Sequence, residues 1–220
     1  MGNSIIGSGA SLIMSIRSLV TFFSLLLSSV VMTNDDSKSP PDDHASNAWQ
    51  IEAYSSAAPD FIGKFASVIG GNGEVLRKGT NGWTCMSLNP RPFPKVGWKS
   101  PHDAMPACAD SEGLKWMRAA MSGEKPSMKR DTFIWMLHGD VGEDNTKMGV
   151  LNKRDATPGQ WIESGPLLML MPKDTATLNG FHADFSRGEP YVMMPGSDYA
   201  HLMIPLGDYY KYQKESEPAD

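Results

Sequence analysis

Four histidines after residue 100 are the residues best suited to acid–base or metal chemistry. An imidazole titrates near neutral pH, and a neighbouring carboxylate can orient it as a general base. Two or three imidazoles with a carboxylate can instead bind a divalent metal. The four are His102, His138, His182 and His201, and three of them are followed within two residues by an aspartate. The sequence supplies the residue types for either use and does not show that they converge.

His138 and His201 form the preferred catalytic pair, because both fall on predicted strands. With Asp140 as the carboxylate, they predict a hydrolase or lyase, and a metal-dependent form would add His102 and His182 as ligands to a divalent ion. The ordinary alternative is that each histidine is a surface group or a satisfied residue beside the core.

Standard signatures of catalysis and of nucleic-acid binding are missing from the sequence. It contains no G-x-S-x-G, H-E-x-x-H, S-x-x-K or P-loop motif, which removes the easily recognised enzymes but not enzymes in general. The net charge is -5, and the basic residues form no stripe, so binding to nucleic acid is disfavoured.

Aromatic and methionine side chains offer a site for binding without catalysis. Phe93, Trp98, Tyr191 and Tyr199 could line a groove for an apolar ligand, or they could simply pack a loop onto the domain. The chain also has 15 methionines, and thioether sulfur suits Cu(I), so metal handling by Met and His is a third hypothesis. Core filling is the better account of these methionines, because many fall within apolar strands and helices.

The first 48 residues are predicted to lie outside the folded domain. Residues 19–32 are uncharged and mostly apolar, with Arg17 before them and acidic residues after them. This pattern is typical of a secretory signal, and the run is shorter than the roughly 20 residues of a membrane-spanning helix. Residues 1–32 are therefore expected to be a signal segment, for which Met14 would be a more usual start, and residues 33–48 a disordered spacer. The alternatives are an uncleaved anchor or a core helix.

The two cysteines, Cys85 and Cys108, are expected to form a disulfide. In an exported protein a single pair usually does so, and their spacing excludes a C-x-x-C redox motif. Closing a loop of this length stabilises a fold by about 3 kcal/mol in the chain-entropy model. Free buried thiols and a metal or redox role are the alternatives. The Pro-rich segment between the cysteines would become a constrained surface loop.

The remaining pattern predicts one α+β domain over residues 49–212, followed by a charged tail at 213–220. We expect a mainly antiparallel sheet of five or six strands with two or three short helices. Strands are predicted at 65–69, 74–78, 83–86, 132–138, 167–171, 191–194 and 199–205, and helices at 51–64, 112–122 and 174–181.

The last two strands decide which face His201 occupies. A four-residue loop at 195–198 would make Met194 face Tyr199 across the hairpin. The residues then expected to share the face of His201 are Val192, Met194, Tyr199 and Met203.

Three stretches resemble a group of exported bacterial proteins with no established function. They are GTNGWTCM at 79–86, the downstream Cys108 and Trp116, and PYVMMPGSDYAHLMIPL at 190–206. The resemblance covers most of the folded part and implies export, but it implies no activity and assigns no catalytic residue.

The first hypothesis is therefore an exported domain that binds a small molecule or another exported protein, with the membrane involved only through the export signal. Its surface would combine the loop between the cysteines with the His201 face. The exported enzyme and the metal-handling protein stand as alternatives.

Overall fold

The computed structural model describes residues 43–212, all within one unit of the chain. The predicted signal segment at 1–32 and the tail at 213–220 lie outside the described residues. Helix α1 (Asn47–Ser55) begins inside the predicted spacer, where the Ser46 hydroxyl accepts a hydrogen bond from the Trp49 N–H as its N-cap. Residues 43–48 therefore belong to the fold.

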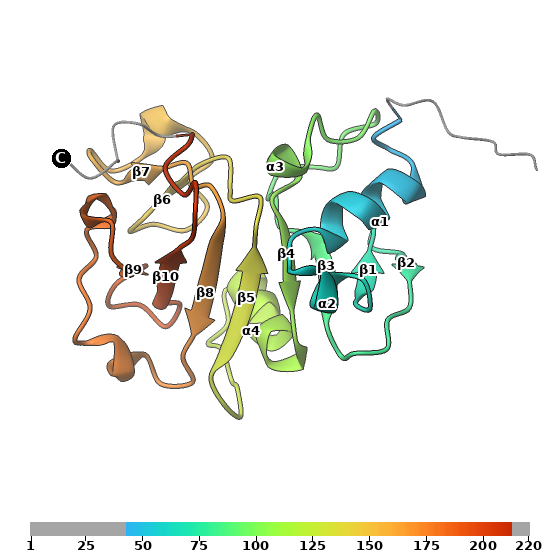
Figure 1. The fold of residues 1–220 in the computed structure, drawn as a ribbon. Helices are drawn as coiled ribbons and strands as arrows, with labels where there is room; N and C mark the ends of the chain where they lie inside the picture. The colour runs from blue at the N-terminus through green and yellow to red at the C-terminus, as the bar shows by residue number, and fades with distance from the viewer. Residues whose placement is uncertain (1–42, 213–220) are drawn as a thin grey trace, which may run out of the picture. The chain divides into compact units, whose positions relative to one another are not determined.

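Eight strands form one mixed sheet in the order β2-β1-β3-β4-β5-β8-β10-β9 (Figure 1). The β1–β3 pair is parallel, and the other six pairs are antiparallel. A separate two-stranded ribbon pairs β6 with β7. The strands are β1 (Ser67–Ile69), β2 (Val75–Arg77), β3 (Thr84–Ser87), β4 (Pro106–Ala109), β5 (Thr132–Met136), β6 (Glu143–Asp144), β7 (Trp161–Ile162), β8 (Leu167–Met171), β9 (Tyr191–Met193) and β10 (His201–Pro205).

The α+β class holds, but the predicted sheet of five or six strands with two or three helices is wrong. Within residues 43–212 there are four α-helices, the others being α2 (Asp60–Gly63), α3 (Pro101–Ala104) and α4 (Ser111–Ser122). The missed strands are short or carry weak strand formers, as in the Pro-Ala-Cys-Ala of β4. Neighbouring strands on both sides make such a segment extended, and the sequence does not show those neighbours. None of these helices is long and apolar enough to cross a membrane.

Helix α4 follows the sequence pattern closely. The Asp110 carboxylate accepts hydrogen bonds from the Glu112 and Gly113 N–H groups, both at 2.9 Å, and so caps the first turn. Gly123 ends the helix with φ of 73°, a conformation that favours glycine. Trp116 and Met117 are buried against the sheet. Helix α4 thus covers one face of the sheet.

The two faces of the sheet carry different side chains. One row across the strands runs through Cys85, Cys108, Trp135, Leu168 and Ile204. Helix α1 packs on this face over β1 to β4, and we call it the α1 face. The neighbouring row runs through Ile134, Met169, Met203 and Tyr191 and points the other way, towards α4, so we call that side the α4 face.

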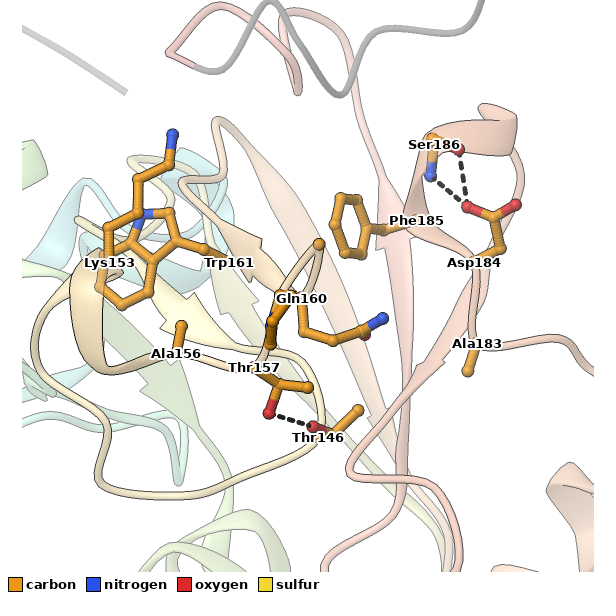
Figure 2. Close-up of a pocket in the computed structure, with 12 residues that line it drawn as sticks. Thr146, Lys153, Ala156, Thr157, Gln160, Trp161, Ala183, Asp184, Phe185 and Ser186 are labelled. Carbon is orange, nitrogen blue, oxygen red and sulfur yellow. Dashed lines mark hydrogen bonds between the residues drawn. The ribbon is translucent and has the colours of Figure 1, made fainter.

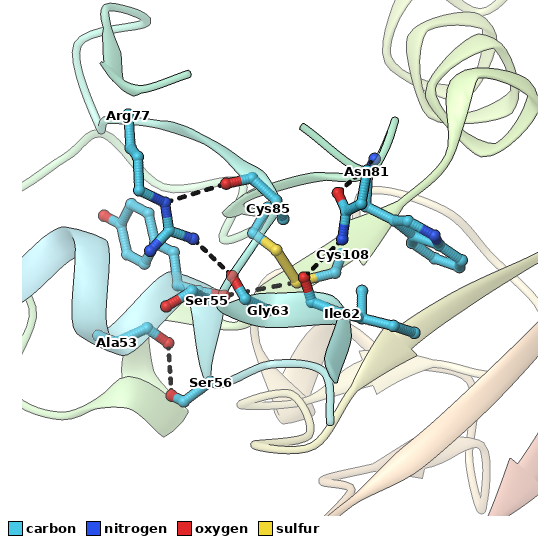
Figure 3. Close-up of a disulfide and its surroundings, with 12 residues drawn as sticks. Ala53, Ser55, Ser56, Ile62, Gly63, Arg77, Asn81, Cys85 and Cys108 are labelled. Carbon is cyan, nitrogen blue, oxygen red and sulfur yellow. Dashed lines mark hydrogen bonds between the residues drawn. A yellow bond between two sulfur atoms is a disulfide. The ribbon is translucent and has the colours of Figure 1, made fainter. Parts of the chain in front are cut away.

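The predicted disulfide is present and links β3 to β4 on the α1 face. Cys85 and Cys108 lie directly opposite each other on β3 and β4, with 4.0 Å between their Cα atoms and no solvent exposure (Figure 3). Nearby, the Asn81 amide donates a 2.8 Å hydrogen bond to the Ile62 carbonyl. Arg77 donates to the carbonyls of Gly63 and Ala66. These bonds fasten α2 to the β2–β3 segment beside the disulfide.

The final hairpin differs from its prediction by one residue. His201 pairs with Met193, and Leu202 pairs with Val192. The reason is Met194, which leaves the strand with φ of 54° while its N–H donates to the Asn145 carbonyl at 2.8 Å. His201 therefore shares the α4 face with Tyr191, Met193 and Met203, and not with Val192 as predicted.

Candidate functional site

A cleft of about 600 Å³ opens on the α4 face of the sheet. Its polar lining includes Asp140, Glu143 and His201, and Trp116 of α4 adds an aromatic wall. Ten methionines dominate the rest of the lining: Met86, Met105, Met117, Met121, Met136, Met148, Met169, Met193, Met194 and Met203. A volume of this size is typical of small-molecule sites.

The methionines reach the cleft from strands of the sheet, from α4 and from loops. Strands β8, β9 and β10 contribute Met169, Met193 and Met203 because these positions all face α4. Helix α4 contributes the buried Met117 and the exposed Met121, and the segment after β6 brings Met148 to the rim. Unbranched thioether side chains adapt their shape easily, so such a wall can fit ligands of more than one outline.

His201 lies at one end of the cleft with a fixed ring orientation. Its Nδ1 is 2.8 Å from the Tyr199 carbonyl, which can only accept, so Nδ1 carries the proton. The ring packs edge-to-face on Trp116 with centroids 5.2 Å apart. Burial lowers the pKa of His201 to about 4, and the hydrogen bond to Tyr199 offsets this only partly. At neutral pH the ring is uncharged, and Nε2 offers a lone pair.

Two carboxyl groups, from Asp140 and Glu143, line the cleft after the end of β5. Burial raises the pKa of Asp140, although the Ser164 hydroxyl donates to it at 2.6 Å and the Gly142 N–H at 3.0 Å. Burial, followed by the charge of Asp140, raises the pKa of Glu143 to about 8. Asp140 has donors and Glu143 has none among residues 43–212. Asp140 is therefore the first of the pair to ionise, and Glu143 keeps its proton at neutral pH.

A pair of buried tyrosines lies behind these carboxyl groups. The Tyr191 and Tyr209 hydroxyls are 2.5 Å apart. Burial raises the pKa of both phenols well above the usual value, and the charges of Asp140 and Glu143 add to the effect. The cleft wall thus has carboxyl groups and an imidazole, and the tyrosine pair lies in the core that packs behind it.

The rim of the cleft is held in place by Asp144, which is fully buried on β6. Its carboxylate accepts hydrogen bonds from the N–H groups of Thr146, Lys147 and Thr157, at 2.8, 3.1 and 2.6 Å, and from the Thr146 hydroxyl. Burial alone would raise the pKa of Asp144, but these donors lower it to about 2. The carboxylate therefore fixes the course of the chain around the rim.

The structure does not bring His138 and His201 together. His138 follows β5, and its Nε2 lies 2.8 Å from the Ser56 hydroxyl at the end of α1, whereas His201 faces α4. The residue that does approach His138 is His102, whose Nδ1 is 2.7 Å from the His138 carbonyl oxygen and whose ring stacks on Tyr212 at 3.7 Å. Two of the four histidines are thus neighbours, but not the predicted catalytic pair.

The predicted metal ligands His102 and His182 are also apart. His182 lies beside the edge strand β9 and contacts the Glu189 carboxylate at 3.0 Å, while His102 lies on α3 near β5. Within residues 43–212, no three His, Cys, Asp or Glu side chains are arranged to hold a metal ion. A divalent site of that composition therefore has no support in the described fold.

The predicted aromatic groove is divided between several places. Trp98 is 6% exposed and packs in the α1-face core with Phe93, so both fasten the loop between the cysteines to the domain. Tyr191 is fully buried opposite Met203 and does not itself line the methionine cleft. Tyr199 packs edge-to-face against Trp116 and donates to the Glu124 carbonyl at 2.9 Å. None of the four lines the cleft, but Tyr191 and Tyr199 pack in the core that forms its wall.

A second hollow, of about 590 Å³, lies between the turns before β7 and residues 183–186 (Figure 2). Its polar side chains take part in local turns: the Asp184 carboxylate caps Ser186, and the Thr146 and Thr157 hydroxyl oxygens are 3.4 Å apart. The methionine cleft, with an imidazole and two carboxyl groups at its wall, is the richer site chemically.

No family model, curated protein or solved structure matches this chain. The resemblance to exported bacterial proteins therefore stays a prediction.

Glu143 is the site residue that the sequence did not reveal, whereas Trp116 was named only among the residues that carry the resemblance. Glu143 lies in the segment between β5 and β7, and no local pattern indicates that its side chain lines a cleft. The methionines were visible as a count, but their gathering on one face follows from the sheet order. One signal was available: if the register of the last hairpin is known, the alternation of side chains puts Met193, His201 and Met203 on one face.

Proposed function

We propose that this domain binds a small, mostly apolar molecule in the methionine-lined cleft. The observation that carries the proposal is the cleft itself, about 600 Å³ in volume, with ten methionines in its wall and polar groups at only a few points. Ligand sites in proteins have this composition, in which apolar contacts give affinity and a few polar groups fix orientation. The proposed surface thus includes the His201 face but not the loop aromatics.

The neutral dye Nile red, whose fluorescence rises in apolar surroundings, tests this proposal directly. The wild-type protein should bind it saturably at one site. Ala120 lines the cleft from α4, so Ala120→Phe should fill the space and weaken binding at least about tenfold, or 1.4 kcal/mol. Arg118→Phe places the same side chain on the exposed side of the same helix and is the matched control.

The control should bind the dye like the wild type. Equal loss in both variants, or no saturable binding by the wild type, would show that the cleft is not the binding site.

A second candidate function, hydrolysis through a nucleophilic serine, is favoured by one contact. The Ser56 hydroxyl lies 2.8 Å from His138 Nε2, and burial, followed by the charges of Lys211 and His102, lowers the pKa of His138. A neutral imidazole beside a hydroxyl is the core of such a site. A fluorophosphonate probe should then label Ser56, and Ser56→Ala should abolish labelling while Ser55→Ala retains it. Labelling elsewhere, or none, would refute this candidate.

We also propose that the domain acts outside the cytoplasm. A disulfide is typical of oxidising compartments, and residues 1–32 have the pattern of a secretory signal. N-terminal sequencing of the protein recovered from the periplasm or medium should show a chain that begins after the apolar run. Recovery of the intact chain only from the cytoplasm would contradict export.

A further inference from the structure

The His201 end of the cleft combines an imidazole with several thioethers on one face of the sheet. His201 is opposite Met193 on β9, and Met203 lies two residues further along β10, on the same side. On the other side of β10, Met171 follows directly after the Leu202–Leu170 pair of β10 and β8. Side chains directly opposite on paired strands have Cβ atoms about 4.5–5.5 Å apart. His201 is therefore surrounded by methionines within the sheet.

The hydrogen bonds of His201 leave one nitrogen for a ligand. Nδ1 donates to the Tyr199 carbonyl, and Nε2 has no hydrogen-bond partner among residues 43–212. A carbonyl on the opposite ring nitrogen is the usual device that orients a metal-binding histidine. His201 is only 5% exposed, yet it lines the cleft, so an incoming ion can reach this ring.

We propose that His201, Met193 and Met203 form a binding site for a monovalent soft metal ion, Cu(I). Thioether and imidazole donors together select this ion over the hard cations, which prefer carboxylate and carbonyl oxygen. The indole of Trp116, already in contact with the His201 ring, closes the site from the α4 side. This inference goes beyond the binding of an apolar molecule, because the ion needs only one end of the cleft.

The charge of the ion follows from the charge of the donors. An imidazole and two thioethers are neutral, and the surrounding wall is apolar. Burying a charge without an opposite charge costs free energy that grows steeply with the size of the charge. A monovalent ion is therefore much easier to hold here than a divalent one, which separates this site from the divalent site expected from His102 and His182.

Anaerobic titration of the purified disulfide-bonded protein with Cu(I), in competition with bicinchoninate, tests the proposal. One Cu(I) should bind per chain and quench part of the tryptophan fluorescence, and Trp116→Phe should remove that quenching. The double substitution Met193→Leu and Met203→Leu conserves volume, so it should fold, but it deletes both sulfurs. Its Cu(I) affinity should fall by more than the roughly 10–100-fold cost of losing an outer-shell partner.

The control is Met128→Leu, which changes a methionine of the same core that does not line the cleft. This control should bind Cu(I) like the wild type. The proposal is overturned if the wild type does not bind one Cu(I), if the Met193/Met203 variant binds it as well as the wild type, or if the control loses it to the same extent as that variant. Nile red binding by the same variants reports separately on the apolar cleft.

Discussion

The two faces of the sheet differ in how they are packed. The α1 face holds the buried disulfide and is packed tightly by small residues of α1 and its following turn, among them Ala53, Ala57 and Ala58. The α4 face is lined with methionines, leaves a cleft and buries ionisable groups such as Asp140. The tightly packed core under α1, with its covalent link, stabilises the domain, whereas an open cleft with desolvated polar groups is where a ligand gains most from contact.

This division also separates the predicted site residues. Phe93 and Trp98 lie on the α1 side and hold the loop between the cysteines, so they contribute to stability. His201 and Tyr191 lie on the α4 face, and His201 lines the cleft. Substitutions on the α1 face should therefore change stability without changing binding, and the three predictions below test this separation.

The largest effect is expected from the disulfide. Replacing Cys85 and Cys108 together by Ala should lower the free energy of unfolding by about 3 kcal/mol, because the open chain regains the entropy of a long loop. Urea denaturation measures the change. Nile red affinity, measured under native conditions, should stay within about twofold of the wild type, since the cysteines face away from the cleft. A stability loss below about 1 kcal/mol, or a parallel loss of dye binding, would contradict the division between a stabilising α1 face and a binding α4 face.

A smaller loss is expected at the rim, from Asp144→Asn. The charged carboxylate accepts several backbone hydrogen bonds, and its replacement should cost about 2 kcal/mol at pH 7. The folded pKa of about 2 lies below the unfolded value, so the contribution is present above pH 4 and is lost as pH falls towards 2. Denaturation curves at pH 7 and pH 3 should thus show a smaller difference between variant and wild type at pH 3.

The control is Asp184→Asn, which removes a carboxylate from an exposed turn and should change stability by less than about 0.5 kcal/mol at either pH. Unlike the disulfide variant, Asp144→Asn should also weaken dye binding, because the rim of the cleft depends on Asp144. Unchanged binding would show that the rim does not need this carboxylate.

A pH dependence of the opposite sign comes from Glu143. Its folded pKa of about 8 exceeds the unfolded value, so the folded state holds a proton between about pH 5 and 8 that the unfolded chain has released. The free energy of unfolding should therefore fall as pH rises through this range. Glu143→Gln should remove that fall and gain at least about 1 kcal/mol relative to the wild type between pH 5 and pH 8.

Glu163→Gln serves as the comparison for this pH profile, since it changes the same residue type on the segment after β7. Parallel curves of unfolding free energy against pH for the wild type and Glu143→Gln would show that Glu143 is solvated and ionised. The two faces would then not differ by a protonated carboxyl group at Glu143.

Much of the local structure could be predicted because it depends on neighbours in sequence. Asp110 and Gly123 mark the ends of α4, and the Leu-Leu-Met-Leu-Met run of β8 is a central strand as expected. The glycine-rich turn before β2 also forms its hairpin, with φ of 83° at Gly73. The strands of β4 and β6 could not be found in this way, since they are extended only because their partners pair with them.

By itself, the sequence determined the α+β class, the pairing of the two cysteines and the presence of many thioethers and of four histidines after residue 100. Only the tertiary structure decided which of these meet. A single long-range hydrogen bond, from the Met194 N–H to the Asn145 carbonyl, shifts the last hairpin by one residue. Because side chains alternate along a strand, that shift puts His201 beside Met193 and on the α4 face. The burial that keeps Glu143 protonated depends in the same way on chain segments distant in sequence, which no local pattern encodes.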